Sequence, residues 1–325
     1  MNIQQLEYIV AVDTYRHFAK ASEKSFVTQP TLSAMIQKLE EELAVKIFDR
    51  SKHPVIPTRE GEEILRRAKQ ILSEVNGIKN FAHELRGETM GELRLGIIPT
   101  LAPYLLPLFL KSFREKNPGL TLYIKEMLTE EIILGLKTGQ LDIGLLATPL
   151  HEHKIAEHSL FCEELFAYAN GYAQLADNRP IMLQEIDLSN LWLIEEGHCL
   201  RNQVFNLCEM KKLEIKKENL HYQAGSIETL INLVDNHSGM TIIPELATFN
   251  LKTTQKKKIH QFAEPQPMRE ISLVVEKDFP RKKLIKQLKT EILCCVPLNL
   301  NRRCKVILEV KSQEELNPWQ YAALA

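Results

Sequence analysis

Residues 28–43 read TQPTLSAMIQKLEEEL, and this stretch decides the fold of the N-terminal part of the chain. Thr28 is a good N-cap, and Pro30 falls in the first turn, where its missing N–H does no harm. The apolar residues repeat at helical spacing, at Leu32, Ile36, Leu39 and Leu43. The opposite, outer side carries polar side chains, namely Gln29, Thr31, Ser33, Gln37 and Lys38. The stretch therefore predicts an amphipathic helix with a polar face.

Short elements are expected on both sides of this helix. An amphipathic helix should follow Asn2, and a compact helix should span residues 18–24 before a tight turn. Such a compact helix, turn and second helix form a helix-turn-helix, in which the second helix enters the major groove of DNA. On periodicity alone, a small helical bundle of another kind is an equal alternative. The segments 47–48 and 55–56 could pair as a short wing that carries Arg50 and Lys52 as phosphate contacts.

A heptad repeat occupies residues 58–87. Its apolar residues step by four and three, at Ile64, Ala68, Ile71, Val75, Ile78, Ala82 and Leu85. Thr58 can cap the start of this helix and Gly87 can end it. The repeat predicts a long helix that packs against a second copy of the chain. A helix that packs on its own domain is the alternative.

Strands and helices alternate after Gly91. Strands are expected at residues 93–98, 120–125 and 142–146, with helices at 105–116 and 130–138 between them. This order predicts a βαβαβ unit with a parallel sheet. A second unit begins near Leu165, with strands at 191–194 and 240–243 and helices from Leu200 and over 226–236, and the strand 271–276 and helix 284–294 return to the first unit. Two such lobes would leave a cleft between them.

The predicted fold class is α/β, in four parts. Residues 1–57 form a winged helix-turn-helix DNA-binding domain, and residues 58–87 form a linker and dimerisation helix. Residues 91–295 form a two-lobed effector domain like a periplasmic binding protein, with lobe I at 91–163 and 268–295 and lobe II at 164–267. Residues 296–325 are a C-terminal tail that fits no element, although 305–310 could form a short extra strand.

Composition limits the class of protein. The 325 residues are 44% hydrophobic and 26% charged, as in a soluble globular protein. No segment approaches the roughly 18 uncharged apolar residues of a membrane span, and no signal peptide is recognisable, so we expect a cytoplasmic protein that does not contact a membrane. The net charge of -1 gives no global sign of nucleic-acid binding. Six irregularly spaced cysteines argue against a secreted disulfide scaffold and against a zinc ribbon.

Two of these cysteines lie in the segment 197–208, GHCLRNQVFNLC. Cys199 is expected just ahead of a helix, whose N-terminus, together with Arg201 or a protonated His198, would favour the thiolate that attacks peroxide. Cys208 falls on the apolar face of that helix and should be buried in the reduced state. Nine helical residues would separate the two cysteines by roughly 13 Å, beyond the roughly 7 Å Cα limit for a disulfide, so a bond requires the helix to unravel. Spacing alone favours two ordinary buried cysteines.

The N-terminal motifs resemble the DNA-binding domain of the LysR-type family of bacterial transcription regulators. The resemblance rests on HFAKAS at 17–22, VTQPTLS at 27–33 and IQKLEEELAVKIFDR at 36–50, and the two-lobed domain downstream is similar to the effector domain of the family. It implies DNA contacts from eight residues, Thr28, Gln29, Pro30, Thr31, Ser33, Gln37, Lys38 and Arg50. Ala44 stands where Gly is usual, and Gln37 stands where a basic residue is common, which weakens one expected DNA contact.

Three downstream motifs resemble the OxyR-like peroxide sensors of this family. They are GHCLR at 197–201 with Cys208, GIIPT at 96–100 with YLLP at 104–107, and SIETL at 226–230. The resemblance implies that Cys199 is the peroxidatic thiol and Cys208 the resolving thiol. It further implies that Thr100 and Thr129 hold the peroxide and that His198 and Arg201 support the site. Asp142 and Arg269 match positions that serve the switch and the subunit contacts.

The implied protein is a regulator, not an enzyme, that senses hydrogen peroxide by a reversible Cys199–Cys208 disulfide and controls antioxidant genes. Its expected partners are double-stranded DNA, a dimer of dimers of its own chain, RNA polymerase, and thiol reductants such as glutaredoxin or glutathione. No cofactor is expected. Cys162, Cys294, Cys295 and Cys304 have no assigned role, and a metal site at the last three lacks an evident fourth ligand.

Two other functions stay open at this point. A LysR-type regulator could respond to a small organic ligand in the interlobe cleft, in which case the cysteines would be incidental. A thiol peroxidase is the alternative from a different class, and it would leave the DNA-binding half without a purpose.

Overall fold

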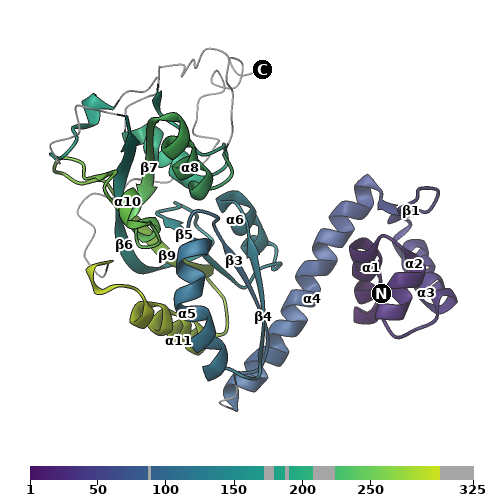
Figure 1. The fold of residues 1–325 in the computed structure, drawn as a ribbon. Helices are drawn as coiled ribbons and strands as arrows, with labels where there is room; N and C mark the ends of the chain where they lie inside the picture. Colours follow the sequence, from purple (N-terminus) through teal and green to yellow (C-terminus); the bar gives the residue numbers. More distant parts are fainter. Residues whose placement is uncertain (87–88, 172–178, 187–189, 208–223, 301–325) are drawn as a thin grey trace. The chain divides into compact units, whose positions relative to one another are not determined.

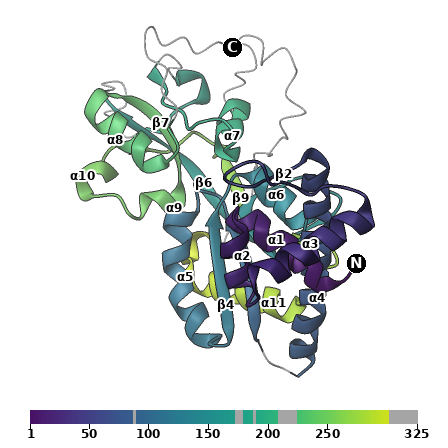
Figure 2. The same cartoon turned by 90° about the vertical axis from the view of Figure 1, so that its right-hand side faces the viewer.

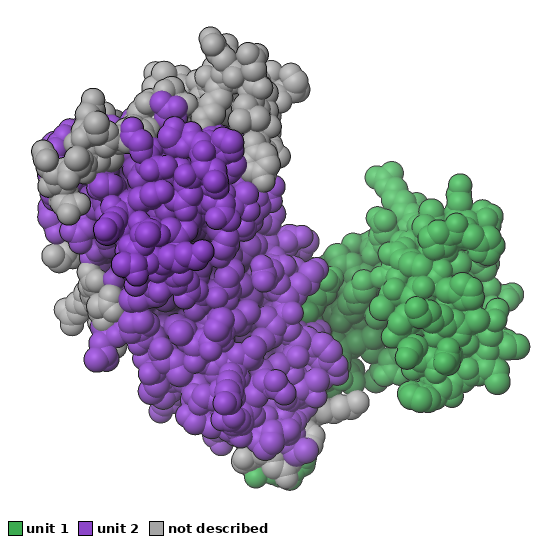
Figure 3. Space-filling model, in the orientation of Figure 1, with its two compact units in different colours: residues 1–88, 135–141 green, residues 89–134, 142–325 purple. Residues whose placement is uncertain are grey.

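The computed structural model describes residues 1–86, 89–171, 179–186, 190–207 and 224–300. The chain divides into two compact units, which are coloured separately in Figure 3. Unit 1 comprises residues 1–88 and 135–141, and unit 2 comprises residues 89–134 and 142–325. The four-part division and the lobe boundaries given above stay predictions.

Unit 1 contains the predicted winged helix-turn-helix. Its elements are α1 (Ile3–Tyr15), α2 (Phe18–Lys24), α3 (Gln29–Leu43), β1 (Phe48–Asp49), β2 (Ile56–Pro57) and α4 (Arg59–Leu85) (Figure 1). Thr28 caps α3, because its hydroxyl oxygen accepts a hydrogen bond from the Thr31 N–H at 3.4 Å. Leu32, Ile36 and Leu39 are fully buried in the core of the unit, as the periodicity predicts. The strands β1 and β2 pair antiparallel, each beginning one residue later than expected.

The long helix α4 packs on its own unit at one end. Thr58 caps its start, since the Gly61 N–H donates to the Thr58 hydroxyl at 2.9 Å. Leu65 and Ala68 belong to the core of unit 1. Farther along, Ile71 is 41% exposed and Ile78 is 72% exposed. The first part of the repeat therefore serves intramolecular packing, and the pairing of the exposed part with a second copy stays a prediction.

Unit 2 begins with the expected parallel sheet. Its first elements are β3 (Gly91–Ile97), α5 (Ala102–Lys116), β4 (Leu120–Glu126), α6 (Thr129–Lys137) and β5 (Ile143–Thr148). The last three residues of α6 are counted with unit 1. The strand β3 pairs in parallel with β4 on one side and β5 on the other. The βαβαβ prediction is confirmed, with helix and strand ends that differ from the predicted ones by at most three residues.

A long strand that the sequence did not predict joins the two halves of unit 2. β6 (Ile155–Asn170) pairs with β9 (Met268–Glu276) as far as Glu164 and with β7 (Gly239–Pro244) from Leu165 onward. In the described part of the chain, the sheet has the order β4-β3-β5-β9-β6-β7, with β8 (Ile259–His260) also on β6. Figure 2 shows β6 and β9 passing between the two halves of unit 2. This exchange of partners along one strand marks the crossing between the two lobes.

The strand predicted at residues 191–194 is wrong as a regular strand. This segment makes only isolated bridges at its two ends, between Leu191 and Met240 and between Ile194 and Ala224. An apolar run of four residues does not specify a neighbouring strand with which it pairs along its whole length. Here the two ends of the run pair with different segments. The possible strand at 305–310 lies outside the described residues.

Helices cover the sheet of unit 2. The remaining ones are α7 (Cys199–Leu207), α8 (Ile227–His237), α9 (Glu245–Thr248), α10 (Thr253–Lys256) and α11 (Lys282–Cys295), with short 3-10 turns at Leu183–Glu185 and Leu298–Leu300. α11 packs against α5 and the first part of β6, and α8 packs against β6 and β7 (Figure 1).

Replacing Phe26 with Asn should stabilise unit 1. Phe26 lies in the turn before α3 with φ of 54°, a left-handed conformation that is costly for a bulky residue, and its side chain is 95% exposed. Asn tolerates this conformation, so we expect Phe26→Asn to raise the free energy of unfolding by about 0.5–1 kcal/mol. Urea unfolding measures the change. Phe26→Ala removes the ring but keeps the strain, and an equal gain in that control would contradict the backbone explanation.

Candidate functional site

The start of α3 presents a polar surface. Of the residues predicted to contact DNA, all are exposed except Ser33, which is half-buried; the exposed ones are Thr28, Gln29, Pro30, Thr31, Gln37, Lys38 and Arg50. Gln37 donates to the Glu41 carboxylate at 2.9 Å, so its amide is partly engaged within the helix. The surface has the exposure that a recognition helix needs, and the individual DNA contacts stay predictions.

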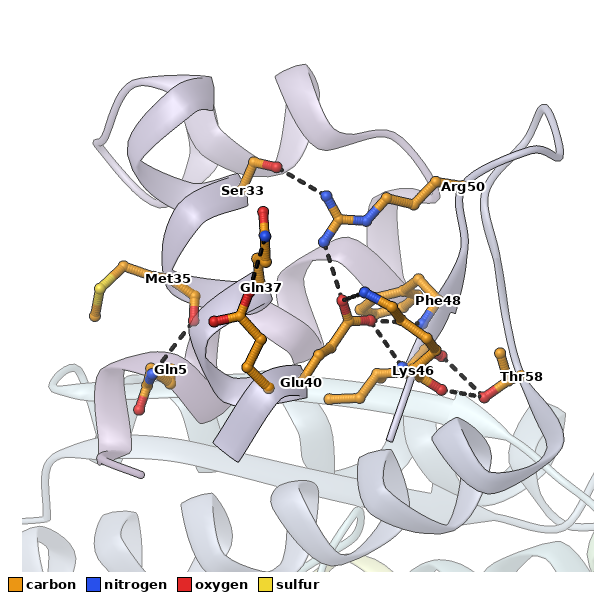
Figure 4. A network of polar contacts seen from close by, with 11 residues as sticks. Gln5, Ser33, Met35, Gln37, Glu40, Lys46, Phe48, Arg50 and Thr58 are labelled. Carbon is orange, nitrogen blue, oxygen red and sulfur yellow. Dashed lines mark hydrogen bonds and ion pairs between the residues drawn. The ribbon is translucent and has the colours of Figure 1, made fainter. Parts of the chain in front are cut away.

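Arg50 links the wing to α3 (Figure 4). Its guanidinium donates to the Ser33 hydroxyl at 3.0 Å and to the Glu40 carboxylate at 3.2 Å, and it lies 4.9 Å from the centre of the Phe18 ring. Part of its donor capacity is therefore already used within the domain. Arg50 both orients Ser33 and remains exposed enough to meet a phosphate.

Glu40 is a structural residue that sequence reasoning missed. Its carboxylate is almost fully buried and accepts hydrogen bonds from the N–H groups of Ile47 at 2.8 Å and Phe48 at 3.2 Å (Figure 4). It thereby fixes the start of the wing on α3. The available signal was its position one turn after Ile36, on the apolar face, where a carboxylate requires partners.

Cys199 is the first residue of α7 and is only 3% exposed. Burial raises the pKa of its thiol, against the opposing effects of the Arg269 guanidinium, the Thr129 hydroxyl and the Leu200 and Ala147 backbone groups. The buried Thr129 hydroxyl faces the sulfur and has no hydrogen-bond partner of good geometry among the described atoms. The structure thus brings Cys199, Thr129 and Arg269 together and leaves one hydroxyl there with unused hydrogen-bonding capacity.

Arg269 is held by a buried ion pair. Its side chain and that of Glu163 both have no exposed area, and its Nε donates to Glu163 Oε1 at 2.8 Å. The other guanidinium nitrogens donate to the Thr100 hydroxyl at 3.1 Å and to the Thr100 carbonyl at 3.2 Å. Glu163 also accepts from the Leu246 N–H at 2.9 Å. Thr100 is therefore joined to the thiol site through Arg269.

Sequence reasoning missed two groups around this pair. Glu163 gave no local signal, because its partner is 106 residues away. Tyr104 was quoted only as part of a motif; its pKa is raised by burial and by the Glu228 carboxylate, so its hydroxyl stays protonated. A sequence motif identifies residues by their spacing along the chain. It does not show which buried charged side chains lie next to them in the fold.

His198 and Arg201 differ from the expectation that they favour the thiolate as cations. Burial lowers the pKa of His198, whose Nε2 lies 3.5 Å from Glu195, so the imidazole is mostly neutral at pH 7. Arg201 donates to the Ile194 carbonyl at 3.0 Å and stacks on Phe205. The cation that acts on Cys199 is Arg269, because strand pairing brings it to the thiol from a distant part of the chain.

Gly197 sets the approach to the thiol. Its φ is +89°, a left-handed conformation that side chains rarely adopt, and a β-carbon there would lie 2.7 Å from Leu128 Cδ1. Glycine is therefore required for the chain to turn tightly past Leu128 before α7 begins.

The site residues still to be placed are Asp142 and the cysteines other than Cys199. Asp142 forms an ion pair with Arg94 at 2.9 Å at the start of β5, and its role in switching or subunit contacts stays a prediction. Cys208 and Cys304 lie outside the described residues. Cys162, a residue without an assigned role, is disulfide-bonded, whereas Cys199, Cys294 and Cys295 are free thiols.

Within the described residues, no group of three or more His, Cys, Asp or Glu side chains is arranged to hold a metal ion. None of the helices there combines the length and the apolar character needed to cross a membrane.

A winged helix-turn-helix followed by a two-lobed α/β domain defines a DNA-binding regulator with a sensory domain. Residues 3–62 match the family model described as "Bacterial regulatory helix-turn-helix protein, lysR family", and residues 86–293 match the "LysR substrate binding domain". The chain therefore belongs to the LysR family of transcription regulators.

Its relatives include proteins named for hydrogen peroxide. The "Hydrogen peroxide-inducible genes activator" of Haemophilus influenzae is 35% identical over 280 residues, covering 86% of this chain and 92% of that protein. OxyR of Escherichia coli is 34% identical over 289 residues, covering 89% and 93%. A full-length OxyR variant from Pseudomonas aeruginosa, with a cysteine replaced by aspartate, has a similar structure, with a TM-score of 0.74, 30% identity, and coverage of 93% of this chain and 100% of that chain.

Thr129→Val should make Cys199 harder to ionise. The substitution keeps the shape of the side chain but removes a hydroxyl that lowers the pKa of the thiol. Losing one hydrogen bond to the thiolate, worth about 1.4 kcal/mol, corresponds to a shift of about one pKa unit and to a roughly tenfold slower reaction with iodoacetamide at pH 8. Mass spectrometry of the Cys199 peptide across a pH series measures this.

The matched control for that measurement is Thr241→Val. Thr241, on β7, is also buried, but its hydroxyl donates a hydrogen bond to the Trp192 carbonyl and not to Cys199. It should leave the pH profile of Cys199 unchanged. A profile that is equally unchanged in Thr129→Val would remove Thr129 from the thiol site.

Proposed function

We propose that this LysR-family regulator binds DNA and senses hydrogen peroxide through Cys199. The observation that carries the proposal is the buried thiol on which the Arg269 guanidinium acts and which faces the Thr129 hydroxyl, a group with unused hydrogen-bonding capacity. A peroxide molecule needs such donors and acceptors, because each of its oxygens both donates and accepts hydrogen bonds. Support also comes from relatives named as hydrogen peroxide-inducible activators and from an OxyR mutant of Corynebacterium glutamicum whose structure is described as bound to hydrogen peroxide, at 28% identity and a TM-score of 0.56.

The resting thiol is protected. Because burial raises the pKa of Cys199, the protonated form dominates at neutral pH, and only a small reactant can reach a side chain that is 3% exposed. Arg269 and Thr129 stabilise the thiolate once it forms. The site therefore favours hydrogen peroxide over larger electrophiles.

The redox chemistry has two steps. The Cys199 thiolate attacks one peroxide oxygen, the O–O bond breaks, and hydroxide leaves, so that Cys199 becomes a sulfenic acid. The thiol of Cys208 then attacks the sulfenic sulfur and water leaves as the Cys199–Cys208 disulfide forms. Thiol reductants such as glutaredoxin or glutathione reverse the change by thiol–disulfide exchange.

The disulfide acts as a switch because α7 separates its two cysteines. Cys199 begins this helix and Cys208 follows its last residue, Leu207. A helix of this length holds the two positions about 13 Å apart, and a disulfide needs Cα atoms within about 7 Å. Forming the bond requires α7 to unwind and to release Leu200 and Val204 from the core, where they are buried. Oxidation thus remodels this lobe rather than only its surface.

The output of the switch is transcription. The chain acts as a dimer of dimers in the cytoplasm, where it reads spaced half-sites in double-stranded DNA with α3, contacts RNA polymerase and controls antioxidant genes. The exposed Ile71 and Ile78 on α4 support pairing with a second copy. Asp142 takes part in the switch and in the subunit contacts. Arg269 has no exposed area, so it takes part in the switch from inside the domain and not in the resting subunit contacts. As a stoichiometric sensor, the chain is not expected to turn over peroxide at enzyme-like rates.

Brief exposure to one equivalent of hydrogen peroxide should produce a Cys199–Cys208 disulfide. Non-reducing peptide mapping identifies the bond, and Cys199→Ser and Cys208→Ser should each abolish it. Cys294→Ser is the matched cysteine control and should still form it, because Cys294 is an exposed free thiol on α11. Unreactive Cys199, or a bond from Cys199 to another cysteine, would overturn this switch. In the first case, a regulator that responds to an organic ligand becomes the better hypothesis.

Arg50→Ala and Lys38→Ala should weaken DNA binding in different ways. Lys38 is exposed on α3, so losing one phosphate contact should lower the slope of log affinity against log salt by about 1 without affecting stability. Arg50 also holds Ser33 and Glu40, so its loss should in addition lower the melting temperature. Fluorescence anisotropy at several salt concentrations, together with thermal unfolding, separates the two effects. Unchanged affinity in both variants would contradict the proposed DNA-binding face.

A further inference from the structure

A hollow lies between α11 and the β6–β9 pair, on residues that the thiol site does not use. Its accessible volume is about 490 Å³, within the range of small-molecule sites. Four side chains of apolar character line it, namely Ala156, Val275, Phe279 and Ile285. Phe279 is only half-buried, so part of an aromatic ring faces the hollow. We call this feature the α11 groove.

The polar lining of the α11 groove is entirely basic. It consists of His158 on β6, Lys277 just after β9, and Lys282, Lys286 and Lys289 on α11. No acidic side chain is among the described lining residues. Across the described part of the chain, none of these four lysines forms an ion pair. Four positive charges therefore surround an apolar floor without internal neutralisation.

The spacing of the lysines concentrates this charge. Lys282, Lys286 and Lys289 follow one another by four and three residues, so they share one face of α11. Like charges at this spacing repel one another. Burial and, to a lesser extent, the nearby Lys289 lower the pKa of His158, which leaves this imidazole neutral at pH 7 and able to donate a hydrogen bond. An anion in the groove would relieve the repulsion.

We propose that the α11 groove binds a small organic anion, with its carboxylate, phosphate or sulfonate group among the lysines and an apolar or aromatic body on the floor of the groove. A bare inorganic ion would leave the apolar floor unused. An uncharged ligand would leave the lysines unneutralised. The lining residues are separate from Cys199, Thr129 and Arg269, so the proposal does not depend on peroxide sensing.

Phenyl phosphate is a suitable probe because it combines a ring with a dianion. Titration calorimetry on the reduced, full-length protein should give a Kd for phenyl phosphate at least tenfold below those for inorganic phosphate and for phenol. Equal binding of phenyl phosphate and inorganic phosphate would mean that the apolar floor takes no part, and the proposal would fail. An absence of phenyl phosphate binding at millimolar concentration would also overturn it.

Substitutions locate the binding. The double variant Lys286→Gln/Lys289→Gln should weaken phenyl phosphate binding by tenfold or more, whereas Lys283→Gln should not. Lys283 is the matched control, because it is an exposed lysine on the same helix but does not line the groove. Ala156→Leu should block binding without changing the charge. If Lys283→Gln weakens binding as much as the double variant does, the anion is held by general surface charge and the proposal fails.

Two readouts distinguish a site from an altered surface. Phenyl phosphate should raise the pKa of His158, measured by NMR of its ring protons, because a nearby anion stabilises the imidazolium. If phenyl phosphate leaves the pKa of His158 unchanged, the anion binds outside the groove and the proposal fails. Analytical ultracentrifugation should show the same oligomeric state for the lysine variants and the unaltered chain. If the variants change only that state and not anion binding, the groove is an interface between copies and the proposal is overturned.

Discussion

The ion pair between Glu163 and Arg269 lies where the two lobes of unit 2 meet. The two residues are directly opposite each other on β6 and β9, and β6 leaves β9 for β7 just beyond them. Neither side chain is exposed, so the desolvation of both charges must be offset by good geometry. The bonds to Thr100 and to the Leu246 N–H supply it. This ion pair and its hydrogen bonds thus connect the loop before α5, the strands β6 and β9, and the helix α9.

The same pair sets the electrostatics of the thiol. An isolated buried cation would strongly favour the Cys199 thiolate, but the adjacent Glu163 carboxylate offsets part of that field. Burial consequently prevails, and the pKa of Cys199 is raised rather than lowered. A permanently ionised thiol would react with many oxidants and alkylating agents. A protonated thiol beside a fixed guanidinium is instead poised to ionise when a reactant that can take part in hydrogen bonding enters the site.

The contrast between local and non-local structure explains what the sequence could predict. The bounds of α2 and α3 follow from capping and periodicity, and α7 begins at Cys199, two residues after the required turn at Gly197. These features depend on neighbours within about one helical turn. The cation beside Cys199 depends on strand pairing across 106 residues, so the sequence pointed to Arg201 and His198, which are adjacent in the chain. The resemblance pointed to Arg269 only as a residue of the switch and the subunit contacts, and the structure shows that it pairs with Glu163 and acts on Cys199.

β6 escaped prediction for a physical reason. Its register on β9 shifts between Ser159 and Phe161, because an extra residue, Leu160, is accommodated there. Before the shift, Ala156 and His158 oppose Val275 and Leu273; after it, Phe161 and Glu163 oppose Ile271 and Arg269. Those four residues of β9 share one face, because alternate residues of a strand do. The inward positions of β6 therefore change from even to odd, which breaks the alternation that reveals a strand in a sequence. The bulge is also what allows the lining of the α11 groove and the ion pair behind Cys199 to lie on the same face of one strand pair.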